Sequence, residues 1–467
     1  MTPRRAAYTL LRAVDGGAYA NLELPRILRD LRLEGRDAGF ATELAYGALR
    51  WQGRYDPMIA IAAGRGLDAI DAAVMSTLRL GVHQVLGMRV PAHAAVAETV
   101  ALARQVNGAG AAGFVNAVLR RVSERSLEAW MDAVSGSITD PIAQLAVAQS
   151  HPVWIVKALR AALLGHGAAT QETVDAVLTA ALAADNEPAR VSLVARPGLA
   201  TVDELVSAGA ELGRWAPTSV TLPGGDPGSI SAVRDGRAAV QDEGSQLVTL
   251  ALAEAPLDGV VEGRRERWLD LCAGPGGKAG MLAALALQRG ASVVANEVSE
   301  HRADLVRKTL RPAIEAGWPG QVEVWVGDGR EIGGDHPAEF DRVLVDAPCT
   351  GLGALRRRPE ARWRKQPEDV AQLAALQRGL LASALDAVRP GGLVAYVTCS
   401  PHLVETRFAV ADVVKRRADI ETLDAREYVL DRGGEPVPDT GEGPAVQLWP
   451  HRHGTDAMFL ALLRRTH

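Results

Sequence analysis

Residues 267–280 constrain the fold more than any other part of this 467-residue chain. They run Arg-Trp-Leu-Asp-Leu-Cys-Ala-Gly-Pro-Gly-Gly-Lys-Ala-Gly, and an apolar, alanine-rich segment at 281–287 follows them. Apolar residues, a glycine-rich turn and then a helical pattern predict a strand, a tight loop and a helix. Glycines let the backbone approach a ligand closely, and free N–H groups at a helix start favour an anionic group. The stretch therefore predicts a site for a nucleotide cofactor.

The residues around this turn narrow the choice of cofactor. A P-loop needs a glycine five residues before Gly277 and a hydroxyl after Lys278, but Cys272 and Ala279 stand there. The turn does satisfy the looser dinucleotide fingerprint, and Glu297 ends a second predicted strand about 20 residues on, where an acid suits ribose hydroxyls. An ATPase is therefore excluded, and a nucleoside-containing cofactor or an ordinary glycine-rich turn remains.

Composition sets the broad class of the protein. With 467 residues, 48% apolar and 23% charged, we expect two or three globular domains. The sequence has no apolar run long enough for a membrane span and no secretory leader, so we expect a cytoplasmic protein. Cys272, Cys349 and Cys399 cannot form a paired disulfide framework, and we expect reduced thiols.

Charge is distributed unevenly along the chain. The net charge is −5, which argues against a protein that coats nucleic acid electrostatically. Residues 1–130, however, carry 16 Arg, no Lys and 12 acidic residues, a net charge of +4. A mildly basic N-terminal domain is compatible with RNA contact, and a solvated surface is the alternative.

Periodicity divides the chain into four predicted parts. Residues 1–130 repeat apolar side chains every three to four positions, which predicts an all-α domain, and 131–187 predicts a helical linker. Residues 188–238 predict a small α/β subdomain, with strands at 189–195 and 219–222 around a helix at 202–208. In residues 239–467 strands alternate with helices, which predicts a parallel, doubly wound, Rossmann-like sheet. The strands expected there lie at 267–271, 293–297, 322–326, 342–346 and 393–399, with a last one at 457–463.

Residues able to do chemistry gather at the ends of these strands. Gly274, Glu297, Asp328, Asp346 and Cys399 all lie at or just past a predicted strand end. Ligands of doubly wound sheets bind at the carboxyl ends of the strands. The sequence therefore predicts one ligand-binding edge.

Two thiols at this edge are the most informative residues. Cys349 and Cys399 each begin a loop beside a proline. A cysteine is most often a small buried apolar residue, but a thiol near Lys278 or a helix N-terminus has a lowered pKa and becomes a competent nucleophile.

The motifs resemble a known family. Residues 270–278, 346–351 and 396–401 resemble, in order and spacing, the motifs of RNA cytosine-C5 methyltransferases of the Sun/Fmu (RsmB) family. The resemblance extends to residues 240–245, 355–360 and 450–456. The N-terminal helices resemble the NusB-type RNA-binding domain of the family's 16S rRNA members, so the resemblance covers nearly the whole chain.

The resemblance implies S-adenosylmethionine as cofactor. Glu297 would bind the ribose and Asp328 would lie near the adenine. The implied cofactor-binding residues are Cys272, Ala273, Gly274, Pro275, Gly276, Gly277, Lys278, Glu297, Arg302, Asp328 and Asp346.

The resemblance also implies catalytic roles. Cys399 would add to C6 of the target cytosine, Cys349 would assist release of the enzyme, and Asp346 would hydrogen-bond the N3/N4 edge of the base. The expected partner is RNA, most simply 16S rRNA, with no membrane. A sulfonium methyl donor needs no metal, and we interpret His451 and His453 as part of a turn rather than as metal ligands.

The chain departs from the family pattern in two places. The family more often has Ala-Ala-Pro-Gly-Gly-Lys-Thr, where this chain has Gly274 and Ala279 in place of the second alanine and the threonine. Near the C-terminus, Asp456-Ala-Met-Phe replaces the usual Asp-Gly-Phe-Phe, which we interpret as packing.

The basic stretch at 356–365, with Trp363 interleaved, favours contact with an RNA backbone.

Three other functions fit parts of the sequence. A tRNA-modifying relative shares the motifs, a nicotinamide-dependent dehydrogenase fits the fingerprint and Glu297, and a non-catalytic RNA-binding factor fits the N-terminal helices. The dehydrogenase leaves Cys349 and Cys399 unexplained, and the intact Lys278 and thiols argue against a non-catalytic factor. The sequence leaves open the target nucleotide, the form of the RNA substrate, the oligomeric state and whether the N-terminal domain contacts RNA.

Overall fold

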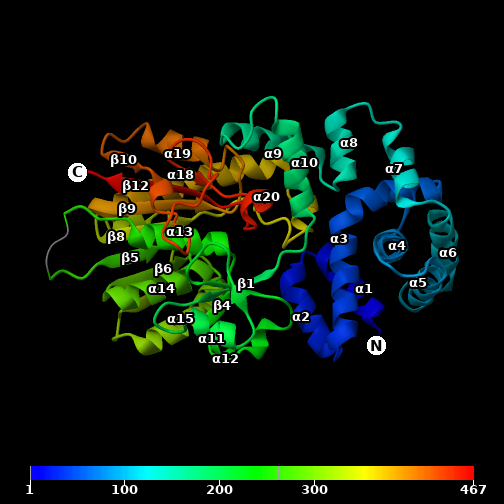
Figure 1. Cartoon of the computed structure of the whole chain (residues 1–467), viewed down its shortest axis with the longest axis horizontal. Helices are drawn as coiled ribbons and strands as arrows, with labels where there is room; N and C mark the ends of the chain where they lie inside the picture. The colour runs from blue at the N-terminus through cyan, green and yellow to red at the C-terminus, as the bar shows by residue number, and fades with distance from the viewer. Residues whose placement is uncertain (1, 260–262) are drawn as a thin grey trace. The chain divides into compact units, whose positions relative to one another are not determined.

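The structure, a computed structural model, describes residues 2–259 and 263–467 and divides into two compact units. Unit 1 consists of Met1–Ala158, Leu182–Glu187 and Leu355–Lys365, and unit 2 of Leu159–Ala181, Pro188–Ala354 and Gln366–His467. The chain therefore leaves unit 2 after Ala354 and returns to it at Gln366. Figure 1 shows the elements of both units along the chain.

Unit 1 is all-α, as its helical periodicity predicts. Leu10, Leu11 and Val14 are buried on one face of its first helix, the spacing expected of an amphipathic helix. Its elements are α1 Pro3–Asp15, α2 Ala20–Asp30, α3 Gly35–Ala63, η1 Leu67–Ala69, α4 Ala72–Val82, η2 His83–Gly87, α5 Ala92–Val106, α6 Ala109–Ser123, α7 Leu127–Ser135, α8 Pro141–Ala148 and α17 Ala361–Arg364. The boundary between the units falls inside α9 Val153–Gly165 and α10 Val174–Asp185. Among the described residues, no helix has the length and apolar character that a membrane span requires.

The segment Leu355–Lys365 is anchored in unit 1 by a buried arginine. The Arg362 guanidinium is buried and donates to Asn186 Oδ1 at 2.7 Å, to the Asp185 carbonyl at 2.6 Å and to the Ser150 carbonyl at 3.1 Å. Burial lowers the pKa of Arg362 to about 10. These partners lie far away in the sequence, so one side chain joins three segments of unit 1.

A second arginine of the same segment is also engaged within unit 1. Arg364 donates to the Val14 carbonyl, near the C-terminal end of α1, at 2.6 Å. The Glu360 carboxylate accepts the backbone N–H of Ala20 at 3.1 Å. The sequence favoured RNA contact for this basic stretch. Arg362 and Arg364 instead bind backbone and side-chain oxygens of unit 1, because carbonyls that a helical bundle leaves unpaired need buried donors.

Unit 2 contains a small antiparallel sheet of order β2-β3-β1-β4. The strands and helix expected at 189–195, 219–222 and 202–208 are present, and the short strands β2 and β4 are additional. The elements are β1 Val191–Ala195, α11 Val202–Ser207, β2 Glu211–Leu212, β3 Ser219–Leu222, η3 Pro227–Ser229, α12 Ser231–Arg234 and β4 Ala238–Val240.

The larger sheet of unit 2 has the order β10-β12-β9-β8-β5-β6-β7, with β11 pairing β12. The five expected strands before residue 400 and the helices between them are present. The strands are β5 Arg267–Asp270, β6 Ser292–Glu297, β7 Val322–Val326, β8 Phe340–Asp346, β9 Val388–Thr398, β10 Ile420–Leu423, β11 Val446–Gln447 and β12 Phe459–Arg465. The helices are α13 Glu243–Glu254, α14 Gly277–Arg289, α15 Glu300–Ala316, α16 Ile332–Asp335, α18 Pro367–Ala387, α19 Arg407–Val414, η4 Ala425–Glu427 and α20 Pro450–His453.

The sheet is mixed, whereas the alternation of strands and helices predicts a fully parallel one. β5, β6, β7, β8 and β9 pair in parallel, but β12 runs antiparallel to both β9 and β10. A parallel neighbour needs a crossover connection, usually a helix of several turns. Only the four-residue α20 directly precedes β12, so the last strand enters the sheet in the opposite direction.

Helices cover both faces of this sheet, as Figure 1 shows for α14 and α15 on one side and α18 and α19 on the other. Successive residues of a strand point to opposite faces, and the two cores divide accordingly. Trp268 and Val293 pack with α13, α14 and α15, and Leu269 and Val294 pack with α16, α18 and α19. A sheet buried on both faces leaves its strand ends as the place where a ligand can enter.

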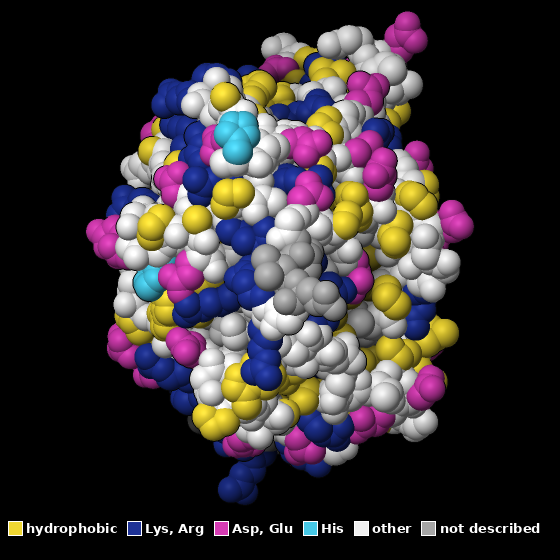
Figure 2. Space-filling model, turned by 90° about the vertical axis from the view of Figure 1, so that its left-hand side faces the viewer, with side chains coloured by type: hydrophobic (Ala, Val, Ile, Leu, Met, Phe, Trp, Pro, Cys, Tyr) yellow, Lys and Arg dark blue, Asp and Glu magenta, His cyan; other side chains and the backbone are white. Residues whose placement is uncertain are grey.

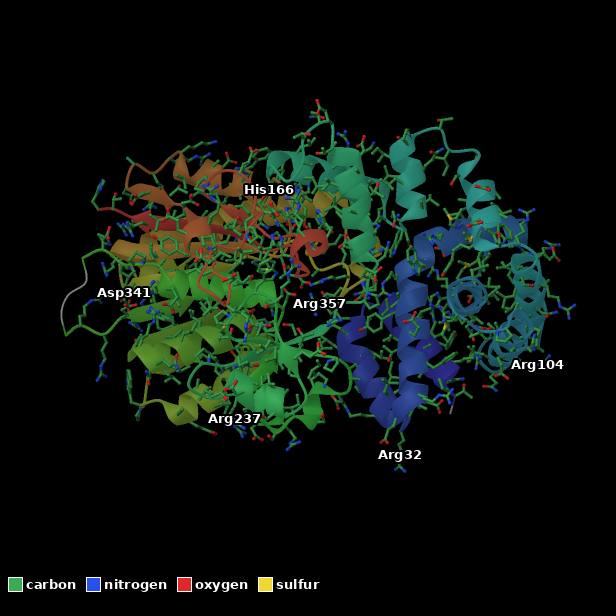
Figure 3. All side chains as sticks on the ribbon, viewed as in Figure 1. Arg32, Arg104, His166, Arg237, Asp341 and Arg357 are labelled. Atoms are coloured by element: carbon green, nitrogen blue, oxygen red, sulfur yellow. The ribbon has the colours of Figure 1, made fainter. Side chains whose placement is uncertain are left out.

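The opposite end of the strands is closed by ion pairs. Asp341, at the start of β8 (Figure 3), is buried and accepts from the Arg389 Nε at 2.6 Å and the Arg267 backbone N–H at 2.7 Å. The face of the molecule drawn in Figure 2 intersperses basic, acidic and apolar side chains. The hydrogen bonds to buried Asp341 thus stabilise this end of the sheet.

Arg362→Ala tests the anchoring of Leu355–Lys365. We expect the variant to destabilise unit 1 by about 3 kcal/mol or more, because it leaves buried hydrogen-bond acceptors without donors. Differential scanning calorimetry of the full chain measures the change. Arg26→Ala is the matched control, because the Arg26 side chain is 63% exposed; equal unfolding midpoints for the two variants would contradict the anchoring role.

Candidate active site

The parallel pairing of four strands brings the predicted site residues to one edge of the sheet. β8 lies between β9 and β5, and β6 pairs with β5. Glu297 is the last residue of β6, and the loops that follow β5, β8 and β9 carry Gly274, Cys349 and Cys399. Because parallel strands end on the same side, these loops open on a shared edge.

The glycine-rich loop after β5 is tied to the end of β6. The Gly274 backbone N–H donates to Glu297 Oε2 at 3.1 Å, and Arg302 Nη2 donates to the Gly274 carbonyl at 2.6 Å. Arg302 and Glu297 also form an ion pair at 3.3 Å. A Cβ at Gly274 would lie 2.2 Å from Glu297 Oε2 and 2.8 Å from Arg302 Nη2, so this chain's glycine permits the close approach of both side chains.

The end of the loop needs a glycine for its backbone. Gly276 has φ +113°, and an added Cβ would lie 2.8 Å from Thr309 Cβ. Gly277, which begins α14, would present its Cβ to open space. Pro275 and Ala273 complete the turn, in which the Ala273 backbone N–H donates to the Asn296 carbonyl at 2.8 Å. The turn thus leaves room beside the start of α14 for a ligand.

Cys272 and Asp328 occupy different surroundings. The Cys272 side chain packs against the apolar core on the α18 face, and burial raises the pKa of its thiol well above the ordinary value. Asp328 pairs with Arg330 Nη2 at 2.5 Å, and these hydrogen bonds lower its pKa. Cys272 therefore contributes its backbone to the loop, while Asp328 remains an ionised acceptor.

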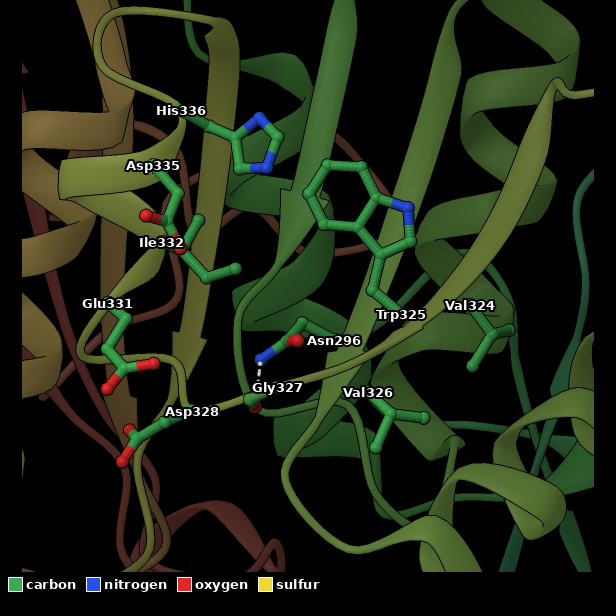
Figure 4. A pocket seen from close by; sticks show the side chains of 10 residues that line it. All are labelled: Asn296, Val324, Trp325, Val326, Gly327, Asp328, Glu331, Ile332, Asp335 and His336. Carbon is green, nitrogen blue, oxygen red and sulfur yellow. Dashed lines mark hydrogen bonds between the residues drawn. The ribbon is translucent and has the colours of Figure 1, made fainter.

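Asp328 also borders a cavity of about 470 Å³. Figure 4 shows this cavity, with the Asn296 amide reaching the Gly327 carbonyl from the neighbouring strand. Its lining consists of Asn296, Val324, Trp325, Val326, Gly327, Asp328, Glu331, Ile332, Asp335 and His336. A hollow with an aromatic wall and acidic acceptors at the end of β7 fits a planar amine-bearing group.

An ion pair joins the first turn of α14 to the end of β8. Lys278 Nζ lies 2.8 Å from Asp346 Oδ2, with the Lys278 side chain only 10% exposed. Burial by itself would lower the pKa of Lys278, but the charge and hydrogen bond of Asp346 raise it. Lys278 therefore stays cationic at neutral pH.

A buried acid lies beneath the same loop. Asp270 ends β5 and is 1% exposed, and its Oδ1 accepts from the Cys272 backbone N–H at 3.3 Å. Burial and then the Asp346 charge raise the pKa of Asp270 to about 8. Its Oδ2 has no hydrogen-bond partner among the described residues, so the loop keeps one buried acceptor available.

The two thiols meet at the ends of β8 and β9. Cys349 Sγ and Cys399 Sγ lie 3.4 Å apart, within hydrogen-bond distance for sulfur. The hydrogen bond from Cys349 lowers the pKa of Cys399, and Lys278 lowers it further, against burial and the Asp346 charge. The pKa of Cys349 is raised well above its ordinary value by that same hydrogen bond, by burial and by nearby negative charge. Cys399 is thus favoured as the thiolate and Cys349 as the thiol.

Sequence reasoning missed several buried polar residues around the thiols. The Glu405 carboxylate accepts hydrogen bonds from Thr350 and Ser400, which follow the two cysteines directly. His166 Nε2 lies 3.0 Å from the Pro401 carbonyl, and burial lowers its pKa to about 4, so it is neutral there. Thr350 and Ser400 stand inside the recognised motifs, but His166 carries no local signal of a role.

His451 and His453 lie in the short helix α20 before β12. His453 Nδ1 accepts the Trp449 backbone N–H at 2.9 Å within the turn of α20. In residues 2–259 and 263–467, no three His, Cys, Asp or Glu side chains are grouped so that they could hold a metal ion.

Comparison with known proteins finds a matching family for each of the two parts of the chain. Residues 261–464 match the family model described as 16S rRNA methyltransferase RsmB/F, and residues 1–124 match that of the NusB family. The ribosomal RNA small subunit methyltransferase B of Pseudomonas syringae pv. tomato is 31% identical over 99% of this chain and 97% of its own length. This chain belongs to the RsmB/F family of 16S rRNA methyltransferases.

Another relative is similar to this chain over nearly the full length of both proteins. A protein of Mycobacterium tuberculosis strain H37Rv named "Putative methyltransferase" is 53% identical over 99% of this chain and 96% of its own. Membership removes the dehydrogenase as an explanation of the glycine-rich fingerprint, because the RsmB/F family uses S-adenosylmethionine.

Solved structures agree on the fold. The crystal structure of PH0851 aligns with a TM-score of 0.79 at 21% identity, over 100% of this chain and 99% of its own. NSun6 from Pyrococcus horikoshii with SFG aligns with a TM-score of 0.53 at 15% identity, over 68% of this chain and 100% of its own.

The residues at the strand ends fit the cofactor of the RsmB/F family. S-adenosylmethionine carries cationic sulfonium and ammonium groups, and three acids, Asp270, Glu297 and Asp346, border the glycine-rich loop. A cation bound beside the buried, unpartnered Asp270 Oδ2 would lower the raised pKa of this acid and make it an acceptor, and the open space at Gly277 leaves room for a ligand.

Gly276→Ala tests the loop. We expect S-adenosylmethionine affinity to fall at least about tenfold, because an alanine at φ +113° is strained and its Cβ meets Thr309. Isothermal titration calorimetry gives the affinity. Gly334→Ala on α16, where an added Cβ meets nothing within 4 Å, is the control; unchanged binding by Gly276→Ala would contradict the assignment of this loop.

Lys278→Met tests the cation beside the thiols. The charge of Lys278 lowers the pKa of Cys399, so its removal raises that pKa and depletes the thiolate, tenfold for each pKa unit below the midpoint. We expect the pH midpoint for iodoacetamide alkylation of Cys399, followed by mass spectrometry in a Cys349→Ala background, to rise by about one unit. Lys308→Met, on the exposed face of α15, serves as control, and an unmoved midpoint in Lys278→Met would refute this role.

Proposed function

We propose that this RsmB/F protein is an RNA cytosine-C5 methyltransferase that acts on 16S rRNA through a covalent bond between Cys399 and C6 of the target cytosine. The observation that carries the proposal is the 3.4 Å approach of Cys349 and Cys399, with Lys278 and Asp346 beside them. Two thiols of unequal pKa at a cofactor edge suit a reaction that needs one nucleophile and one proton-transfer group.

The cofactor-binding residues follow from the loop geometry. Residues 272–278 would hold S-adenosylmethionine, with Glu297 accepting from the ribose hydroxyls and Asp328 from the adenine amine. Arg302 would orient Glu297 through their 3.3 Å ion pair. Bound there, the cofactor supplies the methyl group.

Cys399 starts the chemistry. C5 of cytosine is a poor nucleophile until a group adds at C6, and a covalent thiolate divides one hard step into two easier ones. The Cys399 sulfur forms a bond to C6, and the electron pair of the C5–C6 double bond becomes available at C5. Lys278 favours this step because its positive charge stabilises the thiolate before attack.

Asp346 would bind the target base, and Cys349 would assist release of the methylated RNA. Asp346 would hydrogen-bond the N3/N4 edge of the cytosine, where added positive charge stabilises the adduct, while Lys278 fixes its carboxylate at 2.8 Å. After methylation, Cys349, having lost its own proton to solvent, would accept the C5 proton. The electrons of that C–H bond then re-form the C5–C6 double bond, and the Cys399 thiolate leaves.

The relatives' names and unit 1 support ribosomal RNA as substrate. The matched protein of Pseudomonas syringae pv. tomato is named ribosomal RNA small subunit methyltransferase B. The Bacillus subtilis protein, 29% identical over 98% of this chain, is named "Probable ribosomal RNA small subunit methyltransferase B". A cytosine must be unstacked to reach a thiol at the end of a strand, so a loop nucleotide is the expected target. Unit 1, with its NusB match, would contribute RNA contacts.

Cysteine variants test the proposal. Cys399→Ala should abolish methyl transfer, whereas Cys349→Ala should still attack and methylate but release its product slowly. Each protein is incubated with labelled S-adenosylmethionine and unmodified 16S rRNA and analysed by denaturing gel electrophoresis and nucleoside mass spectrometry. We expect an RNA–protein adduct that accumulates at least about tenfold in Cys349→Ala relative to wild type.

Three outcomes distinguish the alternatives. An adduct that accumulates in Cys399→Ala instead would exchange the roles of the thiols. Methylation of tRNA but not of 16S rRNA would reassign the substrate. Binding of RNA with no 5-methylcytosine from the wild-type protein on either RNA would overturn the enzymatic proposal.

A further inference from the structure

One buried carboxylate connects the loops of the two cysteines. Glu405 is fully buried; its Oε1 accepts the Thr350 backbone N–H at 2.8 Å, and its Oε2 accepts the hydroxyls of Thr350 at 2.5 Å and Ser400 at 2.6 Å. The two hydroxyls also lie 3.1 Å from each other. Because Thr350 follows Cys349 and Ser400 follows Cys399, Glu405 spans the residues adjacent to both thiols.

A helix completes this network. Gln377 of α18 donates from Nε2 to Glu405 Oε1 at 3.2 Å and to the Pro348 carbonyl at 2.8 Å. Pro348 precedes Cys349, so residues on both sides of this cysteine are held by the same buried group of side chains. Such a network is rigid when its members are satisfied.

The two cysteines depend on the network to different extents. Cys399 follows Thr398, the last residue of β9, which pairs with Phe459 of β12, and the Cys399 carbonyl accepts the Gly353 N–H at 2.9 Å. Cys349 lies three residues beyond Asp346, the end of β8. The sheet therefore fixes Cys399, whereas the side chains around Glu405 fix Cys349.

We propose that Glu405 is a positioning residue that holds Cys349 against Cys399, so that release of the methylated RNA depends on Glu405 more strongly than the attack of Cys399 does. The inference rests on the roles proposed above for the two thiols. It assigns a part in the reaction to a residue outside the cofactor loop and outside the base-binding edge.

Single-turnover kinetics with 16S rRNA test the positioning. Adduct formation and adduct decay are followed separately on denaturing gels for the wild type, Glu405→Gln and the matched control Glu421→Gln, whose side chain is exposed on β10. We expect adduct decay to slow at least tenfold in Glu405→Gln and adduct formation to change less than threefold. Equal slowing of adduct formation and adduct decay, or no slowing of either step, would refute the positioning role.

A second variant covers the case in which Glu405→Gln does not fold. Thr350→Val removes one donor to Glu405 but keeps the carboxylate and the side-chain volume, and it should slow decay selectively, whereas Thr350→Ser should restore the wild-type rate. If the wild type itself forms no adduct, the proposed function has failed. If the wild type forms and releases an adduct while Thr350→Val and Glu405→Gln release it normally, only the positioning proposal has failed.

Discussion

The parallel pairing of β8 with β5 on one side and β9 on the other is the constraint on which the site depends. Register places Asp270 beside Leu344 and Asp346 beside Val397. The loops that leave these strands therefore start at nearly the same height, and a lysine in the first turn of α14 reaches the carboxylate at the end of β8. A register shift of one residue would turn every side chain of a strand to the opposite face.

Electrostatics then separates two chemically identical groups. A thiol pair in a uniform medium would share its proton evenly, but here Lys278 lies toward one member and Glu405 toward the other. In a buried site such charges act with little screening by solvent. The difference in pKa between the two thiols thus arises from the surroundings of the two sulfurs and not from the sulfurs themselves.

Sequence reasoning predicted the parts of the fold and site that follow local rules. The predicted strand ends place Glu297, Asp328, Asp346 and Cys399 on one edge, because periodicity and glycine-rich turns are local signals. The antiparallel β12 was not predicted, since direction depends on the path of the intervening chain. Glu405 was missed because an acid within a turn looks like a solvated residue, and only tertiary packing buries it. Arg362 was interpreted as an RNA contact for the same reason: its partners lie 176 to 212 residues away.

The excursion of the chain into unit 1 at Leu355–Lys365 has an evolutionary consequence. A gene cut once, between the segments that encode the N-terminal helices and the sheet, would leave the carbonyls of Ser150 and Asp185 without the guanidinium that satisfies them. The first fragment would lack the segment Leu355–Lys365, and the second would carry Arg362 without the carbonyls that it binds. The N-terminal helices are therefore not an interchangeable module, and we expect recombination to transfer both halves together or neither.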